Sequence, residues 1–202
     1  AQVPIGVGLA FAHKYRNEKK ISRVYVGDGA MSNGQVFEAF NLASLWNLPV
    51  LFIIENNRYG MGTAVNRSAA GKDLYERAIV FGIEGEKING MDFFEVSQAA
   101  TRARDYIYQN SLPYIIEMDT YRYRGHSMSD PATYRTKDEV NEMKSNDPLI
   151  TMKNKLIKDF KVKEDEIMNI ETNIKKQIKE VEKFSLESPL PDIDELFTEV
   201  YL

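Results

Sequence analysis

Hydrophobic and polar residues along this chain follow two different periods, and the two periods alternate. Short, mostly apolar runs rich in β-branched and aromatic residues predict strands at residues 21–26, 50–54 and 114–119. A further short strand is expected at residues 84–88, before the turn signal of Asn89 and Gly90. Between these runs, apolar positions recur every three or four residues, as on one face of a helix. Because strands and helices take turns, the pattern predicts an α/β fold with a doubly wound, mostly parallel sheet.

The helix between the first two predicted strands is apolar on nearly every face. Its regularly spaced positions and its other apolar positions are Val36, Ala39, Phe40, Ala43 and Trp46, and Phe37, Leu42 and Leu45. We therefore expect this helix to be buried. With its two strands it forms a parallel βαβ unit, whose crossover is expected to be right-handed. Both strands then end at one edge of the sheet, where open α/β sheets bind ligands.

The remaining elements of this region are predicted from similar signals. A first helix is expected over residues 1–16, with Pro4 at its first helical position. Residues 58–62 read as a glycine-punctuated loop, and another helix is expected to start at residues 72–75 and to close at Gly82. A later helix is predicted from the spacing of Val96, Ala99, Ala100, Ala103 and Ile107.

The composition changes after residue 136, because residues 137–199 carry many lysines and acidic residues but no arginine. Asp147 and Pro148 predict a helix cap and a first helical residue. A longer helix, ended by Pro189 and Pro191, has an apolar stripe made of Ile167, Ile170, Ile174, Ile178 and Val181. We expect helices of this kind to pack by one face and to be solvated on the other.

Two domains are therefore predicted. Residues 1–136 form the α/β domain, and residues 137–202 form a helical C-terminal extension packed on it. Within this extension, residues 192–202 are expected to dock as a short amphipathic tail. A length of 202 residues with 43% hydrophobic content is enough for one or two domains with a sizeable core.

Composition also narrows the class of protein. The net charge of −4 argues against a nucleic-acid-binding domain, and the sequence has no apolar run of bilayer length and no signal or transit sequence. A soluble, cytosolic-type protein is the simplest expectation. The absence of cysteine excludes disulfides, thiolate metal sites and cysteine nucleophiles, which leaves carboxylate, amide, imidazole and hydroxyl chemistry.

The chemistry suggested by the first two strands is that of magnesium and a diphosphate. Asp28, between two glycines, follows the first strand, and Asn57 follows the second. A carboxylate and an amide oxygen suit Mg²⁺, which fills its octahedron with phosphate oxygens and water. The backbone N–H groups of Gly29 and Ala30, near a helix start, would favour an anion. The alternative is an ordinary βα turn with an aspartate cap.

A second polar stretch, residues 121–135, follows the last predicted strand and should reach the same edge. Arg122 and Arg124 could bind diphosphate oxygens, although surface arginines of this kind are often only solvated. His126 has a proton affinity suited to transfer near neutral pH, and its alternative is a structural role. The other histidine, His13, lies on a predicted packing helix, and we expect it to be structural.

The sequence Gly-Asp-Gly around Asp28 is followed by a pair of asparagines that ends at Asn57. Together they resemble the thiamine-diphosphate-binding signature. Three longer stretches in the same order resemble the alpha subunits of pyruvate dehydrogenase, the decarboxylating first component of pyruvate dehydrogenase complexes: GDGAMSNGQVFEAFNLASLWNLPV, ENNRYGMGTAV and TYRYRGHSMSDP. The resemblance covers essentially the whole chain. It implies the C-terminal part of a longer subunit, so the thiamine-diphosphate-binding domain would lack its N-terminal part here.

The resemblance also implies roles for individual residues. Asp28, the Asn57 side chain and the Tyr59 carbonyl would hold Mg²⁺. Gly29, Ala30 and Arg122 would bind the diphosphate. His126 would contact the cofactor and assist proton movement, as a catalytic residue, while the two-carbon unit passes to a lipoyl group.

The same resemblance implies partners. A beta subunit would complete an α2β2 heterotetramer and supply the carboxylate that activates the aminopyrimidine, so this chain alone should be inactive. The tetramer would dock on a lipoyl-bearing dihydrolipoamide acetyltransferase and feed acetyl-CoA formation from pyruvate. The expected location is cytoplasmic for a bacterial protein and the mitochondrial matrix for a eukaryotic one. Eukaryotic members are inhibited by phosphorylation at the serine that matches Ser127, where added negative charge would oppose anionic ligands.

Three alternatives remain open at this stage. Alpha subunits of branched-chain 2-oxoacid and acetoin dehydrogenases share the GDG and double-asparagine parts, although HSMSDP is closest to pyruvate-specific members. A non-catalytic Mg²⁺-phosphate binding module would use the same sheet edge, but the chain has no GxxxxGK[ST] loop. A truncated, inactive remnant is the third alternative.

Overall fold

The computed structural model describes residues 1–71 and 73–198, and its chain divides into two compact units, Ala1–Met152 and Lys153–Leu202. The strands of the described residues lie in the first unit. The domain boundary after residue 136 stays a prediction.

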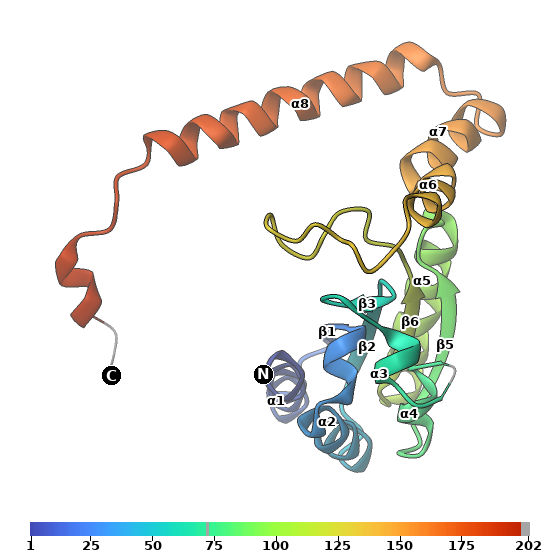
Figure 1. The fold of residues 1–202 in the computed structure, drawn as a ribbon. Helices are drawn as coiled ribbons and strands as arrows, with labels where there is room; N and C mark the ends of the chain where they lie inside the picture. Colours follow the sequence, from blue (N-terminus) through green and yellow to red (C-terminus); the bar gives the residue numbers. More distant parts are fainter. Residues whose placement is uncertain (72, 199–202) are drawn as a thin grey trace. The chain divides into compact units, whose positions relative to one another are not determined.

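A parallel four-stranded sheet forms the centre of the first unit (Figure 1). Its strands run in the order β1 (Ser22–Gly27), β2 (Val50–Asn56), β6 (Tyr114–Asp119) and β5 (Glu84–Asn89). Each of the three neighbouring pairs is parallel. The predicted strands and the predicted parallel α/β fold are confirmed.

Helices cover both faces of this sheet, as doubly wound folds require. On one face, α1 (Gln2–Tyr15) and α2 (Gly34–Leu45) pack over a core in which the Phe40 and Phe52 rings meet edge to face at 4.8 Å. On the other face, Ala103 and Ile107 of α5 (Phe93–Asn110) pack against Ile116. Each large apolar side chain fully buried in this way contributes roughly 1.5–3 kcal/mol to folding.

The expectation that α2 is buried on nearly all faces was wrong. Leu45 is 67% exposed and Trp46 44% exposed, because only the side of α2 that faces the sheet meets the core. Trp46 packs instead on Phe11 of α1, with ring centroids 5.4 Å apart. Similarly, Ala100 of α5 is exposed, although its spacing predicted a packed position.

Two helix starts differ in detail from the prediction. A 3₁₀ segment, η1 (Asp28–Ser32), follows β1, and α2 begins only at Gly34, because the Asn33 side chain caps it by accepting from the Gln35 N–H at 3.0 Å. Pro4 is the third residue of α1 rather than the first, but it still lies in the first turn, where its missing N–H has no helical partner.

The segment after β2 is more ordered than a plain loop. β3 (Tyr59–Gly60) and β4 (Thr63–Ala64) form a short antiparallel hairpin, and α3 (Val65–Ser68) follows. The helix predicted to start at residues 72–75 is short, since α4 spans Glu76–Ile79; Lys72 lies outside the described residues. The chain turns at Gly82, as predicted, with φ of +75°.

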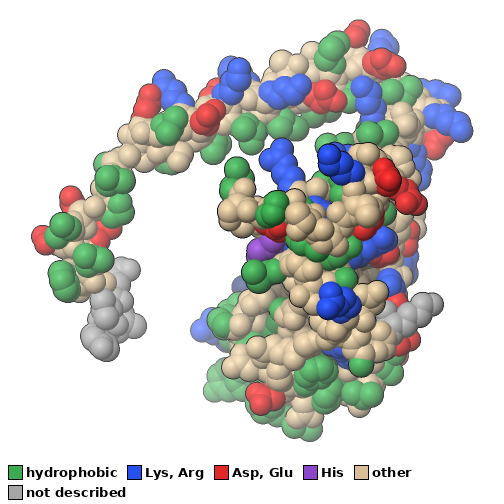
Figure 2. All heavy atoms as spheres, viewed as in Figure 1, with side chains coloured by type: hydrophobic (Ala, Val, Ile, Leu, Met, Phe, Trp, Pro, Cys, Tyr) green, Lys and Arg blue, Asp and Glu red, His purple; other side chains and the backbone are tan. Residues whose placement is uncertain are grey.

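Beyond residue 136, the predicted helix boundaries are confirmed. After α6 (Lys137–Ser145), α7 (Pro148–Lys158) is capped by Asp147, whose Oδ1 accepts from the Leu149 N–H at 2.8 Å. α8 (Glu164–Glu187) ends before Pro189. Of its apolar stripe only Ile167 is buried, and Figure 2 shows hydrophobic side chains along the helix. Packing of this stripe on the α/β domain stays a prediction.

The expected amphipathic tail is described only in part. It contains a 3₁₀ segment, η2 (Ile193–Phe197), and residues 199–202 of that expectation lie outside the described residues. Among helices within residues 1–71 and 73–198, none combines the length and apolar character of a transmembrane span.

Candidate functional site

Asp28 and Asn57 lie at the carboxyl ends of neighbouring strands. β1 and β2 are parallel, with Gly27 in register with Glu55, so the next residues of both strands emerge at one edge of the sheet. Asp28 is only 4% exposed. Its Oδ2 atom and the Oδ1 atom of Asn57 are both buried and accept no hydrogen bond from the described residues. The structure therefore brings together the two predicted ligands.

Two buried oxygens without partners fit a cation site. Leaving such an acceptor unpaired costs about 1–3 kcal/mol, and a metal ion would satisfy both atoms. Within the described part of the chain no group of three or more His, Cys, Asp or Glu side chains could hold a metal. A single carboxylate with an amide oxygen is instead the sparse oxygen set that Mg²⁺ accepts when phosphate and water supply its other ligands.

The electrostatic environment of Asp28 also fits a cation site. Burial raises the pKa of its carboxyl above the ordinary value, while backbone N–H groups of Asp28 and Asn57 and the charge of Arg122 partly oppose that rise. The carboxylate is thus held in a place where its negative charge is poorly compensated. A bound cation would compensate it and bring the pKa down.

Two glycines let the hairpin approach Asp28 closely. A Cβ on Gly60 would lie 3.2 Å from the Cα of Gly29 and 3.7 Å from Oδ2 of Asp28. The backbones of η1 and β3 are therefore nearly in contact beside the candidate metal ligands. A pocket of about 340 Å³ opens next to Gly29 and Ala30, between the first turns of α1 and α2. Binding of a diphosphate in this pocket stays a prediction.

Arg122 is bound to the hairpin. Its Nη1 donates to the Tyr59 carbonyl at 3.1 Å, and its Nη2 donates to the Met61 carbonyl at 2.6 Å and to the Tyr134 hydroxyl at 3.1 Å. The Tyr59 carbonyl, predicted as a metal ligand, therefore already accepts one hydrogen bond. A carbonyl oxygen has two lone pairs, so a second interaction is available. The metal role of Tyr59 and the diphosphate role of Arg122 stay predictions.

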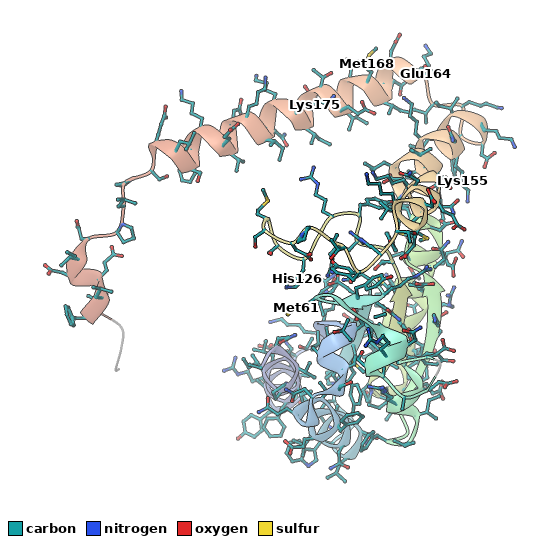
Figure 3. The ribbon with its side chains drawn as sticks, in the orientation of Figure 1. Met61, His126, Lys155, Glu164, Met168 and Lys175 are labelled. Carbon is teal, nitrogen blue, oxygen red and sulfur yellow. The ribbon has the colours of Figure 1, made fainter. Side chains whose placement is uncertain are left out.

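His126 lies beside the same hairpin (Figure 3, where it is labelled with Met61). Its Nδ1 is 3.4 Å from Nη1 of Arg122, and since arginine can only donate, Nδ1 is the acceptor in that contact. The imidazole is exposed, which leaves it open to a ligand at this edge. The structure thus brings His126 to the candidate site, and its catalytic role stays a prediction.

The loop that carries His126 is built around Asp130. The carboxylate of Asp130 accepts from the backbone N–H groups of His126 at 2.7 Å and Ala132 at 2.8 Å, and from the Tyr134 hydroxyl at 2.9 Å. These donors, His126 first, hold the pKa of Asp130 below its usual range. The residue therefore fixes the turn on which His126 is presented.

Arg135 holds the beginning of the same loop. Its guanidinium donates to the carbonyl oxygens of Arg122, Tyr123 and Arg124. Arg124 is exposed, and its diphosphate role stays a prediction. Ser127 is also exposed, with its Oγ 3.2 Å from Oγ of Ser129, so a kinase could reach it.

His13 lies away from these residues. Its Nδ1 is 2.9 Å from Oε2 of Glu18, at the end of α1. This contact agrees with the expected structural role.

Several residues that shape the site were missed from the sequence. Arg77 donates to the Met31 carbonyl at 3.2 Å and so supports η1, and Glu139 accepts from the Tyr121 hydroxyl at 2.8 Å and the Tyr59 hydroxyl at 3.0 Å. Burial, and then the bond to Glu139, raises the pKa of Tyr121 to about 12. No local pattern marks such residues, because their partners lie far away in sequence. Asp130, by contrast, had a local signal, the Asp-Pro pair of a turn.

The chain resembles known proteins over nearly its whole length. Residues 1–194 match the family described as "Dehydrogenase E1 component". The chain is 52% identical over 201 residues to "Pyruvate dehydrogenase E1 component subunit alpha" of Rickettsia felis, covering all of this chain and 62% of the relative. It is 51% identical to the protein of that name from Zymomonas mobilis, over 99% of this chain and 56% of the relative.

A mitochondrial protein of Dictyostelium discoideum, "Pyruvate dehydrogenase E1 component subunit alpha, mitochondrial", is 46% identical over all of this chain and 54% of the relative. The chain thus spans between 54% and 62% of the length of these three curated relatives. On the match over residues 1–194 and the strand-edge site within them, this chain belongs to the dehydrogenase E1 component family.

Proposed function

We propose that this chain is part of the alpha subunit of a pyruvate dehydrogenase E1 component, which decarboxylates pyruvate with thiamine diphosphate and Mg²⁺ and passes the acetyl unit to a lipoyl group. The observation that carries the proposal is the pair of buried, unpartnered oxygens on Asp28 and Asn57. Membership of the E1 family and the names of relatives 46–52% identical support the choice of chemistry and of pyruvate.

Each site residue has a proposed task. Asp28, Asn57 and the Tyr59 carbonyl hold Mg²⁺, and Gly29 and Ala30 donate backbone N–H groups to the diphosphate. The bound cofactor supplies the carbon chemistry of decarboxylation.

Two side chains of the 121–135 segment act beside that cofactor. Arg122 fixes the Tyr59 carbonyl and adds positive charge beside the diphosphate. His126, presented on the Asp130 turn, moves a proton as the acetyl unit leaves for the lipoyl group.

The proposed assembly is an α2β2 heterotetramer with a pyruvate dehydrogenase beta subunit, docked on a lipoyl-bearing dihydrolipoamide acetyltransferase. The resemblance to two-chain members of this family implies that the beta subunit supplies the carboxylate that activates the aminopyrimidine, so this chain alone is expected to be inactive.

Calorimetric titration of thiamine diphosphate with Mg²⁺ into the complex of the full-length protein and its beta subunit tests the proposal. Wild type should bind tightly and only with Mg²⁺, and Asp28→Asn, which keeps the side chain's shape, should lose this binding. Glu55→Gln is the matched control, since it removes an exposed carboxylate at the end of the adjacent strand. Absence of binding by wild type would favour the inactive remnant.

Two further comparisons separate the remaining alternatives. Turnover of pyruvate, 2-oxoisovalerate and acetoin by the same complex should rank pyruvate first, because an acyl pocket discriminates by size. Binding of Mg²⁺-ATP without binding of thiamine diphosphate would instead favour a non-catalytic phosphate-binding module.

A further inference from the structure

Glu117 is a fully buried carboxylate in the middle of the sheet. It lies on β6, a central strand that is otherwise largely apolar, and its side chain has no exposed surface. A buried charge is costly unless hydrogen bonds and charges compensate it. Apolar packing therefore does not explain why a carboxylate occupies this position.

The alternation of side chains along parallel strands places three polar residues on one face. Glu117 is in register with Ile54 of β2 and with Lys87 of β5, and Asn56 lies two residues beyond Ile54, so its side chain points the same way. Oε1 of Glu117 accepts from Nδ2 of Asn56 at 2.7 Å and is 3.7 Å from Nζ of Lys87.

The other oxygen of Glu117 is also used. Oε2 accepts from the backbone N–H groups of Leu74 at 2.6 Å and Tyr75 at 3.0 Å, just before α4. Lys87 is further held by Asp73 at 2.6 Å. Burial disfavours its charge, but the Asp73 hydrogen bond and the Glu117 charge outweigh that effect, so the pKa of Lys87 is raised. These contacts of the carboxylate are thus all with donors or with a cation.

The chain of contacts continues from Glu117 to the candidate site. Glu117 fixes Nδ2 of Asn56, and Oδ1 of Asn56 then accepts from the Arg58 N–H at 3.1 Å, which closes a turn around Asn57. Arg58 adopts a left-handed conformation, with φ of +72°. A non-glycine residue in this region needs local support, and the Asn56 side chain supplies it.

We propose that Glu117 is a positioning residue: it orients the Asn56 amide, and through the turn at Arg58 it aims the side-chain oxygen of Asn57 at the cation beside Asp28. This inference rests on the proposed function. Because a carboxylate can only accept and the Arg58 N–H can only donate, one orientation of the Asn56 amide satisfies both neighbours.

Reversal of the hydrogen bond between Glu117 and Asn56 tests the inference. The amide of Glu117→Gln has two possible orientations. In one its NH₂ group faces Nδ2 of Asn56, and in the other it faces the N–H groups of Leu74 and Tyr75. In both orientations a hydrogen-bond donor faces another donor. In the double variant Glu117→Gln/Asn56→Asp, the new amide donates to the carboxylate introduced at position 56, whose other oxygen still accepts from Arg58. The double variant keeps the size of both side chains and the total charge.

The measurement is the affinity for thiamine diphosphate with Mg²⁺, by calorimetry on the complex with the beta subunit, together with the melting temperature without cofactor. Glu117→Gln should weaken binding about tenfold or more, and the double variant should restore it to within about threefold of wild type. Asn56→Ala, which leaves the other bonds of Glu117 intact, should weaken binding as Glu117→Gln does. It provides the test if Glu117→Gln fails to fold.

Ser22→Ala is the control for stability alone, because it removes a buried hydrogen bond to the Gly6 carbonyl at the opposite end of β1. It should lower the melting temperature without changing affinity. If Glu117→Gln or Asn56→Ala behaves like Ser22→Ala, the positioning role is overturned. It is also overturned if the double variant regains stability but not affinity. Failure of wild type to bind would instead refute the proposed function on which the inference rests.

Discussion

Arg122 and Tyr59 join the two polar segments of the site: Nη1 of Arg122 donates to the backbone carbonyl of Tyr59 at 3.1 Å, across 63 positions of sequence. The same guanidinium also holds the Met61 carbonyl at 2.6 Å. The planar guanidinium holds its donors in fixed directions that match two carbonyls of one hairpin, whereas an ammonium has three donors but lacks this fixed fork. The hairpin beside Asp28 is therefore shaped from the loop that carries His126.

Arg122→Lys should consequently weaken binding of thiamine diphosphate and Mg²⁺ by about tenfold, although the charge is kept, because the ammonium lacks the fixed fork that holds the two carbonyls in place. Titration of the complex with the beta subunit measures the effect. Arg102→Lys is the matched control, since Arg102 makes a forked contact with Glu86 on exposed surface. Equal affinities for Arg122→Lys and wild type would show that the fork is dispensable.

The buried carboxylate of Asp28 should make cofactor-free stability depend on pH. Its pKa is raised in the folded protein, so the protonated form favours folding, and that contribution is present below the ordinary value of about 3.8 and is lost as pH rises through the raised pKa. Asp28→Asn removes this dependence. Above the raised pKa the variant should be more stable than wild type, by roughly 2–4 °C in melting temperature for each kcal/mol recovered.

Melting curves of the two proteins across that pH range, without cofactor, provide the measurement. The curves should converge at low pH, where Asp28 is protonated and resembles asparagine. With Mg²⁺ the order at neutral pH should reverse, because the cation binds only the ionised carboxylate. A constant difference between the two proteins at all pH values would contradict this account.

The fold was largely predictable from the sequence because β1, β2 and β6 are short runs rich in β-branched and aromatic residues. β5 is mostly polar, and its signal was the Asn89-Gly90 turn at its end. The start of α2 was not predictable, since η1 uses the same glycine and aspartate signals that often open a helix, and only the Asn33 cap decides the boundary. The exposure of Trp46 could not be predicted either, because the sequence does not show whether an apolar residue packs in the core or against a neighbouring helix.

Gly125→Ala should disrupt the turn that presents His126. An added Cβ would collide with the carbonyl oxygen of Asp130 and lie 2.9 Å from its Cβ, so the turn would have to open. We expect faster tryptic cleavage after Arg124 and a decarboxylation rate at least about tenfold lower, with a smaller effect on Mg²⁺ binding. Gly34→Ala, where an added Cβ meets no atom within 4 Å, is the control. Unchanged cleavage in Gly125→Ala would mean that the turn absorbs the methyl group.

Ser127→Glu should inhibit decarboxylation, because it places a negative charge next to His126 at a site proposed to bind two anions. We expect a loss of about tenfold or more in kcat/KM for pyruvate. Ser97→Glu, on the exposed surface of α5, adds the same charge elsewhere and should have little effect. If the two variants are equally active, charge at Ser127 is not inhibitory.

Some residues of the site have a recognisable pattern in the sequence, and others are identified only by their contacts in the folded structure. Asp28 and Asn57 follow apolar strands directly, so the parallel arrangement of those strands predicts that they meet. Glu117 had a weaker signal, a single carboxylate inside a buried strand, which was not recognised. Arg77 has no signal at all, because its partner Met31 lies 46 positions away and is reached only once the chain has folded.

The close approach of Gly29 to Gly60 also limits how the sequence can diverge. A Cβ on either residue would meet the Cα of the other at 3.2–3.3 Å, so a substitution at one position cannot be relieved by a change of side chain at its neighbour. The two segments can separate only by moving Asp28 away from the hairpin. Under selection for function, larger residues should therefore be disfavoured at both positions together, even though the two glycines lie 31 positions apart.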